Sequence, residues 1–454
     1  MERTLVLACV EKVGQEVLLK GWINSRRNHG KIVFFDLRDR SGIIQAVWDK
    51  KENFGPEDVV EVKGKIASRP KGMINTKIPT GSVELQVTQV KMLSKAKTLP
   101  LPIDKDGYDI DEEVRLKYRY LDLRRERLNK NIRLRSKFVN LCRQYLFDND
   151  FTEIETPLLT KSTPEGSRDF VVPSRLNPGK FYALPQSPQQ YKQLLMVAGF
   201  ERYFQIARCL RDEDLRADRG FEHTQIDMEM SFVKREDVML MTEGMFTQVF
   251  EKMGARVFQK PFPVFTYKQA MEKFSQDKFD IRPEDQRKPG VMGFAWVTDF
   301  PFFAKDKNNK WTYTHNPFSE PLPEDKEKFL KGDIASIRTT QYDLVCNGLE
   351  VGGGSIRSTD PKILAKVFET IGHDMKDIEK QFGHMLEAFE YGVAPHGGIA
   401  PGIDRLMMVL TGETAMKEVV AFPTTSKGIT SVMDAPSEIS PLQLKELNLC
   451  LKAS

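Results

Sequence analysis

Five short segments of alternating apolar and polar residues lie within the first hundred residues of the chain. Alternation with a period of two is typical of β-strands that bury one face. Turns that contain glycine or other turn-forming residues separate the segments, which span residues 15–23, 31–39, 42–49, 59–68 and 82–93. Five strands in so short a stretch predict a small closed or nearly closed β-barrel over residues 1–100.

The positive charge of the chain is concentrated in the same region. Residues 1–104 contain 18 Lys and Arg against 12 Asp and Glu, a net charge of +6, whereas residues 105–454 carry a net charge of −2. A basic module joined to a nearly neutral body indicates contact with a polyanion. The oligonucleotide-binding Greek-key barrel (OB-fold) is therefore the leading candidate for the first domain.

Composition excludes several other classes of protein. Hydrophobic residues make up 40% of the chain and charged residues 29%, as in globular proteins rather than disordered ones. No apolar run approaches the ~18 residues that a membrane-spanning helix needs, so we expect no membrane association. The five cysteines are scattered singly, which argues against a disulfide framework or a zinc site and favours a reducing, cytoplasmic location.

The rest of the chain predicts a second, larger domain. Residues 101–126 begin with a proline-containing, acidic stretch without periodicity, and we expect a linker there. Apolar residues at helical spacing then predict a helix over 127–149. From there to residue 454, helices alternate with blocks of strands that look hairpin-linked, which favours an α+β domain built on a mainly antiparallel sheet.

Four polar clusters in this second domain could carry chemistry. Arginines and carboxylates alternate over residues 208–219, and guanidinium groups in such a loop can grip a phosphate, although a solvated hairpin tip has the same composition. Residues 343–357 combine two carboxylates with a triple glycine, which could hold a divalent ion or form a simple turn. Arg405 follows a glycine-rich strand, and Lys192 lies near a helix start; each could equally serve packing or the surface.

The order of these clusters resembles that of class II aminoacyl-tRNA synthetases. Their motifs one, two and three are similar to FTEIETP with its preceding helix, the RDEDLR loop, and GIDR entering a helix. The fuller resemblance is to the bacterial-type aspartyl-tRNA synthetase family and covers nearly the whole chain. Its blocks here are GWINSRRNHG, FFDLRDRSGIIQ, LKYRYLDLRR, STPEGSRDF, QSPQQYKQLLM, NGLEVGGGSIR and HGGIAPGIDR.

The resemblance implies a two-step reaction in which aspartate and ATP form aspartyl-adenylate and the aspartyl group then moves to the 3′ end of a tRNA. Arg211 would be catalytic and hold the α-phosphate and the substrate carboxylate, while Glu213 would meet the adenine end of ATP. Asp343 and Glu350 would hold Mg²⁺ on the phosphates, and Arg405, also catalytic, would brace the γ-phosphate. The ATP site would also include Gly402, Ile403 and Asp404.

The resemblance also assigns the aspartate site. Lys192 and Arg357 would grip the side-chain carboxylate of the substrate, with His315 nearby. Two cations facing a short acidic side chain would select aspartate over a neutral amide. The remaining contacts to the substrate would come from Glu165, Gln189, Arg211, Gln225 and Asp227.

The barrel would bind the tRNA anticodon. Phe34 would stack on a base, worth ~1–3 kcal/mol, and Gln45 would hydrogen-bond one. Because Phe34 and Phe35 are adjacent in a strand, we expect one of them to lie in the barrel core. In this family a histidine in the loop RRNHG, here His29, accompanies acceptance of both aspartate and asparagine tRNAs. We therefore expect charging of tRNA(Asp) and tRNA(Asn), with a partner amidotransferase that converts the misacylated product.

The sequence departs from the family pattern at several positions. Gly220 stands in the arginine loop where a glutamine is usual, Asn316 where a second histidine is usual, and Pro401 where an aromatic residue is usual. The resemblance also implies that an insertion domain of more than a hundred residues, normal in bacterial members, is deleted near 280–292. The resemblance therefore divides the chain into an anticodon-binding domain (1–100), a linker (101–126) and a catalytic domain (127–454).

Three rival interpretations share some of these features. An asparaginyl-tRNA synthetase has the same fold, but Lys192 and Arg357 argue against it. A free-standing asparagine synthetase lacks the barrel. A non-catalytic RNA-binding paralogue would not need Arg211, Glu350, Arg357 and Arg405 intact. The motif-one resemblance further implies a homodimer.

Overall fold

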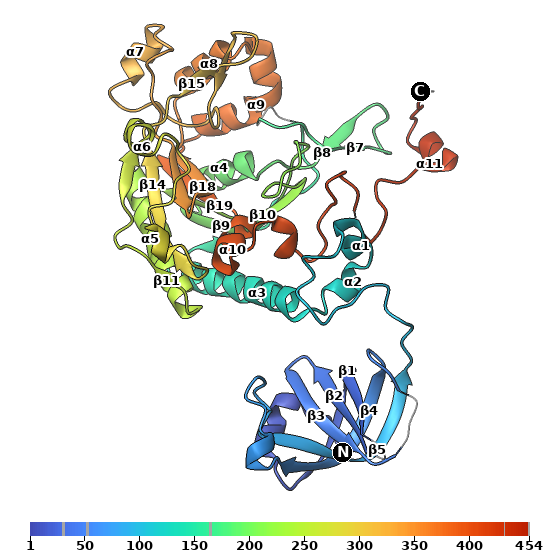
Figure 1. The fold of residues 1–454 in the computed structure, drawn as a ribbon. Helices are drawn as coiled ribbons and strands as arrows, with labels where there is room; N and C mark the ends of the chain where they lie inside the picture. The colour runs from blue at the N-terminus through green and yellow to red at the C-terminus, as the bar shows by residue number, and fades with distance from the viewer. Residues whose placement is uncertain (30–31, 51–53, 163–165, 431, 453–454) are drawn as a thin grey trace. The chain divides into compact units, whose positions relative to one another are not determined.

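The computed structural model describes residues 1–29, 32–50, 54–162, 166–430 and 432–452; the side chains of His29, Met375 and Asp377 fall outside that description. The chain forms two compact units, Met1–Pro102 and Ile103–Ser454 (Figure 1). Within the described residues, no helix combines the length and the apolar character that crossing a membrane requires.

The smaller unit is the predicted barrel, closed in the strand order β1-β2-β3-β5-β4. Neighbouring strands are antiparallel except for β3 and β5, which are parallel. Short 3-10 helices precede β1 and follow β4. The elements are η1 Val6–Glu11, β1 Glu16–His29, β2 Ile32–Asp39, β3 Gly42–Trp48, β4 Val59–Ser68, η2 Lys71–Met73 and β5 Val83–Ser94.

Alternation along β2 decides which of two adjacent phenylalanines fills the barrel. Phe35 is fully buried and packs edge-on against Phe54, with ring centroids 5.0 Å apart. Phe34 points to the outer face and is half-buried. On β3, Gln45 lies opposite Asp36 and also faces outward. Phe34 and Gln45 therefore share one outer face of the barrel, and Phe35 is the core residue of the pair.

The larger unit is built on an eight-stranded sheet in the order β12-β14-β17-β18-β19-β10-β9-β6. The five central pairings are antiparallel, and only the two edge pairings, β12 with β14 and β9 with β6, are parallel. The mainly antiparallel sheet predicted from the sequence is confirmed. Its strands are β6 Thr152–Glu153, β9 Arg202–Leu210, β10 Glu222–Ser231, β12 Val264–Thr266, β14 Phe294–Thr298, β17 Tyr342–Cys346, β18 Leu349–Ile356 and β19 His396–Pro401.

Three helices and one face of this sheet enclose the main hydrophobic core (Figure 1). They are α3 Glu126–Phe147, α5 Arg235–Lys252 and α10 Ile403–Thr411. Phe138, Cys142 and Leu146 recur every four residues along α3, so all three side chains face the core. The helix predicted over 127–149 is α3. Burial of one continuous apolar face leaves the opposite face of the sheet available for polar residues.

Smaller elements surround this framework. Residues 181–183 form β8, one strand of a hairpin outside the main sheet. The two-stranded pieces are β7 Val171–Pro173 with β8 Phe181–Ala183, β11 Arg256–Val257 with β13 Val291–Met292, and β15 Phe303–Lys305 with β16 Trp311–Tyr313. The remaining helices are α4 Gln189–Val197, α6 Tyr267–Phe274, η3 Glu284–Gln286, α7 Lys326–Leu330, α8 Pro361–Thr370, α9 Met375–Glu390, η4 Met416–Glu418 and α11 Pro441–Glu446.

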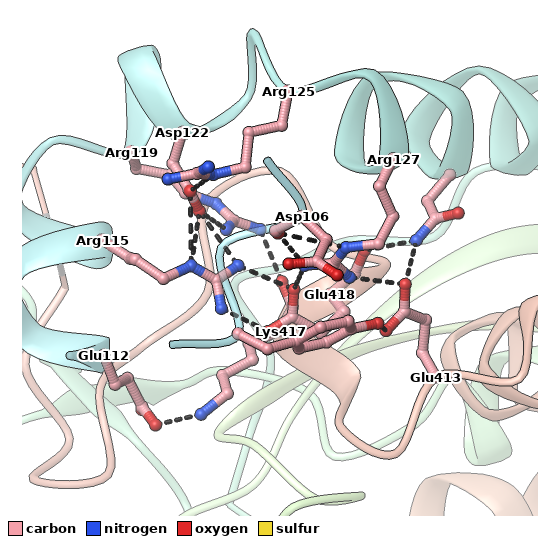
Figure 2. A network of polar contacts seen from close by, with 12 residues as sticks. Asp106, Glu112, Arg115, Arg119, Asp122, Arg125, Arg127, Glu413, Lys417 and Glu418 are labelled. Carbon is pink, nitrogen blue, oxygen red and sulfur yellow. Dashed lines mark hydrogen bonds and ion pairs between the residues drawn. The ribbon is translucent and has the colours of Figure 1, made fainter. Parts of the chain in front are cut away.

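The stretch predicted as a linker, 101–126, differs from that expectation. It contains two short helices, α1 Glu112–Lys117 and α2 Arg119–Asp122, which belong to the larger unit. Their side chains meet residues 413–421 in a buried ion-pair cluster (Figure 2). The partners lie about 300 positions apart in sequence, so composition alone gave no sign of them. The cluster consists of Arg115, Arg119, Asp122, Arg125, Arg127, Glu413 and Glu418.

Asp122 is the centre of this buried ion-pair cluster. Its carboxylate, which is completely buried, accepts hydrogen bonds from Arg115 at 3.1 Å, Arg119 at 2.8 Å and Arg125 at 2.5 Å. The carboxylate of Glu418 accepts hydrogen bonds from both terminal nitrogens of Arg115, at 3.0 and 2.8 Å. Burial would raise the pKa of Glu418, but Arg115 and Arg127 outweigh burial and lower it. These contacts fix the segment after α10 to α1 and α2.

Candidate active site

A cavity of about 350 Å³ lies against the polar face of the eight-stranded sheet. Its lining comes mainly from α4, β10, β18, α10, the loop between β9 and β10, and residues 314–318. Most of the predicted site residues are brought together here. They are Gln189, Lys192, Arg211, Glu213, Gln225, Asp227, His315, Glu350, Arg357, Gly402, Asp404 and Arg405.

Alternation along β10 separates the core from the cavity. Ile226, Met228 and Met230 lie in the hydrophobic core, so the residues between them point to the opposite face. Gln225 and Asp227 line the cavity. The same periodicity places Glu229 on the polar face, although Glu229 is fully buried beneath the cavity floor. The sequence analysis did not name Glu229, and strand periodicity would have identified it.

The floor of the cavity is a buried cluster of two cations and two carboxylates. Lys192 Nζ lies 2.8 Å from Asp227 Oδ2 and 3.4 Å from Glu229 Oε2. Arg357 forms a two-pronged pair with Glu229, at 2.8 and 3.1 Å, and also donates to Ser355 Oγ at 2.8 Å. Burial would raise the pKa of Glu229, but Arg357 and Lys192 outweigh it and lower the pKa to about 2. Both predicted aspartate-gripping cations are therefore held in place by carboxylates.

One buried carboxylate oxygen of this floor retains the capacity to accept a hydrogen bond. Asp227 is fully buried, and its Oδ1 has no hydrogen-bond partner among the described residues, whereas Oδ2 accepts from Lys192. An unpartnered buried carboxylate oxygen costs free energy unless a donor arrives. A substrate ammonium would supply that donor. Gln189 and Gln225 line the wall nearby and are held by Gln193 at 3.0 Å and by the Ala400 carbonyl at 3.2 Å.

The arginine loop forms the other end of the cavity. Arg211 donates from Nε to the Gln186 carbonyl at 3.3 Å, and no described carboxylate pairs with it. Arg405 donates to the Glu350 carbonyl at 2.9 Å and pairs with Asp218 at 3.1 Å. Arg211 and Arg405 thus line a common cavity with their guanidinium groups held from one side, which suits an anion on the other.

Two neighbours of Arg405 play structural parts. Asp404 accepts hydrogen bonds from Arg135 of α3 and from the Thr224 backbone nitrogen, the latter at 3.0 Å. Both of its oxygens are therefore engaged, and Asp404 ties α10 to α3 and β10. Ile403 is fully buried in the hydrophobic core and does not line the cavity. Asp404 lines the cavity whereas Ile403 does not, and contact of either residue with ATP stays a prediction.

The two predicted metal ligands lie on adjacent antiparallel strands. Asp343 is buried, and its carboxylate contacts His315 Nε2 at 3.1 Å and Gln341 Nε2 at 2.7 Å. Burial opposes the charged form of His315, but Asp343 outweighs burial and raises the His315 pKa. Glu350 lines the cavity and pairs with Lys278 at 2.8 Å. The charge of each carboxylate acts on the other.

The carboxylates of Asp343 and Glu350 would suit a magnesium ion that takes its other ligands from water and phosphate. They would not form a site in which the protein supplies every ligand. No group of three or more metal-ligating side chains converges among the described residues. A carboxylate offers about four lone-pair positions, so Asp343 retains acceptor capacity beside its two hydrogen bonds. Magnesium is commonly bound by one or two carboxylates together with water and phosphate oxygens. Asp343 and Glu350 satisfy that pattern.

The glycines of β18 lie so close to neighbouring atoms of the sheet that a side chain would not fit at some of their positions. A Cβ atom on Gly354 would lie 2.1 Å from the Gly398 carbonyl oxygen of β19. On Gly353 it would lie 3.0 Å from Asp343 Oδ1. The triple glycine is therefore neither a simple turn nor only a surface for ligand approach, because close strand packing excludes a side chain at Gly354.

Two of the family departures, Gly220 and Asn316, line the cavity. His223 lines it, and burial together with Arg211 and Arg405 lowers its pKa to about 3, so its imidazole is neutral at pH 7. A Cβ on Gly220 would lie 2.7 Å from Met416 Cε, so Met416 fills the space beside that glycine. Asn316 donates to Gln341 at 3.4 Å. The sequence analysis did not identify His223 or Met416 as cavity residues.

Three other expectations have simple outcomes. Glu165 lies outside the described residues, as does the side chain of His29. Pro401 is the last residue of β19 and pairs with Gly352. In the smaller unit, Phe34 and Gln45 share the outer face of the barrel, where Gln45 donates to Glu84 at 3.3 Å.

Two family models match the chain. Residues 17–93 match the OB-fold nucleic acid binding domain, and residues 111–426 match the tRNA synthetases class II (D, K and N). The second match begins at 111, so it includes α1 and α2 of the stretch expected to be a linker. Together the matches account for both compact units.

Curated relatives resemble the chain over nearly its full length. The aspartate–tRNA(Asp/Asn) ligase of Geotalea uraniireducens is 38% identical and covers 96% of each chain; that of Rubrobacter xylanophilus is 39% identical and covers 97% of this chain and 95% of its own. The aspartate–tRNA ligase of Staphylococcus saprophyticus is 38% identical and covers 96% of this chain and 97% of its own. The first alignment is 569 positions long against 454 residues here, so that relative carries more than a hundred residues that this chain lacks.

Solved structures agree on the fold. The asparaginyl-tRNA synthetase of Pyrococcus horikoshii, complexed with asparaginyl-adenylate, superposes with a TM-score of 0.75 at 20% identity, covering 94% of this chain and 98% of its own. The aspartyl-tRNA synthetase of Entamoeba histolytica gives 0.72 at 21% identity, with coverages of 93% and 91%. The barrel, the antiparallel sheet and the sequence relationships agree, and the chain belongs to the class II tRNA synthetases of the D, K and N group, within the aspartate–tRNA ligases.

Proposed function

We propose that this aspartate–tRNA ligase forms aspartyl-adenylate from L-aspartate and ATP in the cavity of the larger unit, and transfers the aspartyl group to tRNA(Asp) and tRNA(Asn). The observation that carries the proposal is the placement of Lys192 and Arg357 at the floor of the same cavity that Arg211 and Arg405 line. Cations at the floor suit a side-chain carboxylate, and guanidinium groups at the other end suit phosphates.

The floor supports selection of aspartate by charge balance. Lys192 and Arg357 are balanced by Asp227 and Glu229 before substrate arrives. The ammonium of aspartate would donate a hydrogen bond to the unpartnered Asp227 oxygen. The Asp227 carboxylate would then neutralise the charge of Lys192 less completely. The side-chain carboxylate of aspartate would then complete the field of both cations. The neutral amide of asparagine would leave a buried cation poorly matched, which is costly.

The opposite end of the cavity supports adenylate formation. The fixed charge of Arg211 would stabilise the negative charge that gathers around the α-phosphorus as the substrate carboxylate attacks it. Arg405 would hold the outer phosphates, and Glu213 would meet the adenine end of ATP. Magnesium held by Asp343 and Glu350 would neutralise phosphate charge. These residues bind and orient the substrate, and no protein group needs to form a covalent bond.

Dual tRNA specificity rests on the resemblance at His29 and on relatives whose names include both tRNAs. We expect radiolabelled aspartate to be transferred to purified tRNA(Asp) and tRNA(Asn) alike. The His29→Leu variant should lose charging of tRNA(Asn) by about tenfold, the cost of about 1.4 kcal/mol, while charging of tRNA(Asp) stays within twofold. Absence of transfer to tRNA(Asn) by the unaltered protein would exclude dual specificity, and a partner amidotransferase would then have no substrate.

The outer face of the barrel supports anticodon binding. Phe34 and Gln45 lie on this face, and aromatic stacking tolerates any base whereas an amide can read a base edge. The net charge of +6 on residues 1–104 would add attraction to the phosphate backbone. Binding of tRNA by this unit should therefore weaken with rising salt.

A homodimer is supported by exposed apolar side chains near the motif-one strand β6. Leu158 and Leu159, which follow β6, are 51% and 52% exposed, and Val171 of β7 is 57% exposed. Apolar side chains gathered in this way are typical of protein interfaces. Sedimentation velocity at micromolar concentration should give a species of about twice 52.1 kDa. A single 52.1 kDa species across that range would refute the dimer.

A further inference from the structure

Lys278 lies beside the cavity at the end formed by Glu350 and Arg405. It lies in the segment between α6 and η3. Its ammonium is 2.8 Å from Glu350 Oε2, and its side chain remains 45% exposed. The sequence analysis assigned no role to Lys278.

The backbone around Lys278 is held firmly. The next residue, Phe279, is buried, and its ring stacks on Phe274 with centroids 4.0 Å apart. The Phe279 carbonyl accepts a hydrogen bond from the Gly348 nitrogen at 3.1 Å. Gly348 lies in the turn between β17 and β18, two residues before Glu350. The contact between Lys278 and Glu350 is therefore built into the fold and does not result from two free surface side chains meeting.

Glu350 joins two cations. Its carboxylate pairs with Lys278, and its backbone carbonyl accepts from Arg405 at 2.9 Å. Lys278 and Arg405 are close enough for each to act on the charge of the other. Arg405 keeps a carboxylate partner outside this trio, Asp218, whereas Glu350 is the one carboxylate paired with Lys278 among the described residues.

We propose that Lys278 binds the outer phosphates of ATP and the pyrophosphate that leaves, exchanging Glu350 for a phosphate oxygen when Glu350 turns to magnesium. The inference rests on the proposed function for the roles of Glu350 and ATP. A lysine suits this exchange because its ammonium is a compact charge on a flexible stem with three donors. In the free protein Lys278 would compensate the charge of Glu350.

The test compares Lys278→Met and Lys278→Arg with a matched control, Lys268→Met. Lys268 lies on α6, is 86% exposed and pairs with Glu272 at 3.9 Å, so its replacement also removes an ion pair but leaves the cavity untouched. Two measurements are made at saturating magnesium. One is the dissociation constant for inorganic pyrophosphate by titration calorimetry, and the other is the KM for ATP, pyrophosphate and aspartate in ATP–pyrophosphate exchange.

We expect Lys278→Met to weaken pyrophosphate binding and to raise the KM for ATP and pyrophosphate by about tenfold, since a hydrogen bond to a charged group is lost. The KM for aspartate should stay within twofold, and Lys278→Arg should restore most of the affinity. Pyrophosphate affinity equal to that of Lys268→Met would overturn the proposal. Absence of aspartate-dependent exchange in the unaltered protein would instead overturn the proposed function.

Discussion

Replacing Asp122 by asparagine is expected to lower the free energy of unfolding of the larger unit by about 3–5 kcal/mol, because the change leaves buried arginines without their central partner. Asp122 is completely buried and accepts from Arg115, Arg119 and Arg125 (Figure 2). Asparagine has nearly the same shape but no charge. The cluster would then hold four guanidinium groups against two carboxylates.

Urea denaturation followed by circular dichroism measures this loss. Glu112→Gln is the matched control, since Glu112 pairs with Lys417 at the margin of the same region and both side chains are about one-third exposed. Ion pairs of that kind contribute roughly 0–1 kcal/mol. A loss for Asp122→Asn no greater than for Glu112→Gln would show that the buried ion-pair cluster does not stabilise the unit.

The parts of the structure that follow from local periodicity could be predicted from the sequence. Alternating residues gave the barrel and its strands, and helical spacing gave α3, because these patterns depend only on neighbours along the chain. The same logic separates Ile226 and Met228 from Gln225 and Asp227 on β10. Glu229 could have been added by counting two residues further.

The parts that depend on distant partners could not be predicted in this way. Glu229 and Arg357 are 128 positions apart. No local pattern reveals that the carboxylate of Glu229 pairs with the guanidinium of Arg357. The stretch 101–126 was predicted as a linker because its sequence lacks periodicity, and Glu418, which pairs with its Arg115, lies about 300 positions away. The family motif assigned Asp404 to the ATP site, but no local pattern revealed that its oxygens also accept from Arg135 and from the Thr224 nitrogen.

The second large effect is expected at Arg211. Replacing Arg211 by glutamine should reduce aspartate-dependent ATP–pyrophosphate exchange by about 10³-fold in kcat/KM, comparable with the loss of a group that stabilises charge in a transition state. The change should leave stability almost unaltered, because the Arg211 side chain makes one long hydrogen bond, 3.3 Å to the Gln186 carbonyl, among the described residues. Loss of activity without loss of stability would separate a catalytic role from a structural one.

Arg208 supplies the matched control, since it is the same residue type three positions earlier on β9. Its guanidinium pairs with Glu222 and Thr224 on the neighbouring strand and does not line the cavity. Arg208→Gln should keep exchange within about threefold, as expected for a 42% exposed ion pair worth less than ~1 kcal/mol. Equal exchange activity of the two variants would show that Arg211 has no catalytic role, whereas absence of exchange in the unaltered protein would favour a paralogue that binds RNA without activating aspartate. Such a protein would still bind tRNA through the barrel. Both variants should therefore retain the tRNA affinity of the unaltered protein in a filter-binding assay under either interpretation. Only the exchange assay distinguishes the two interpretations.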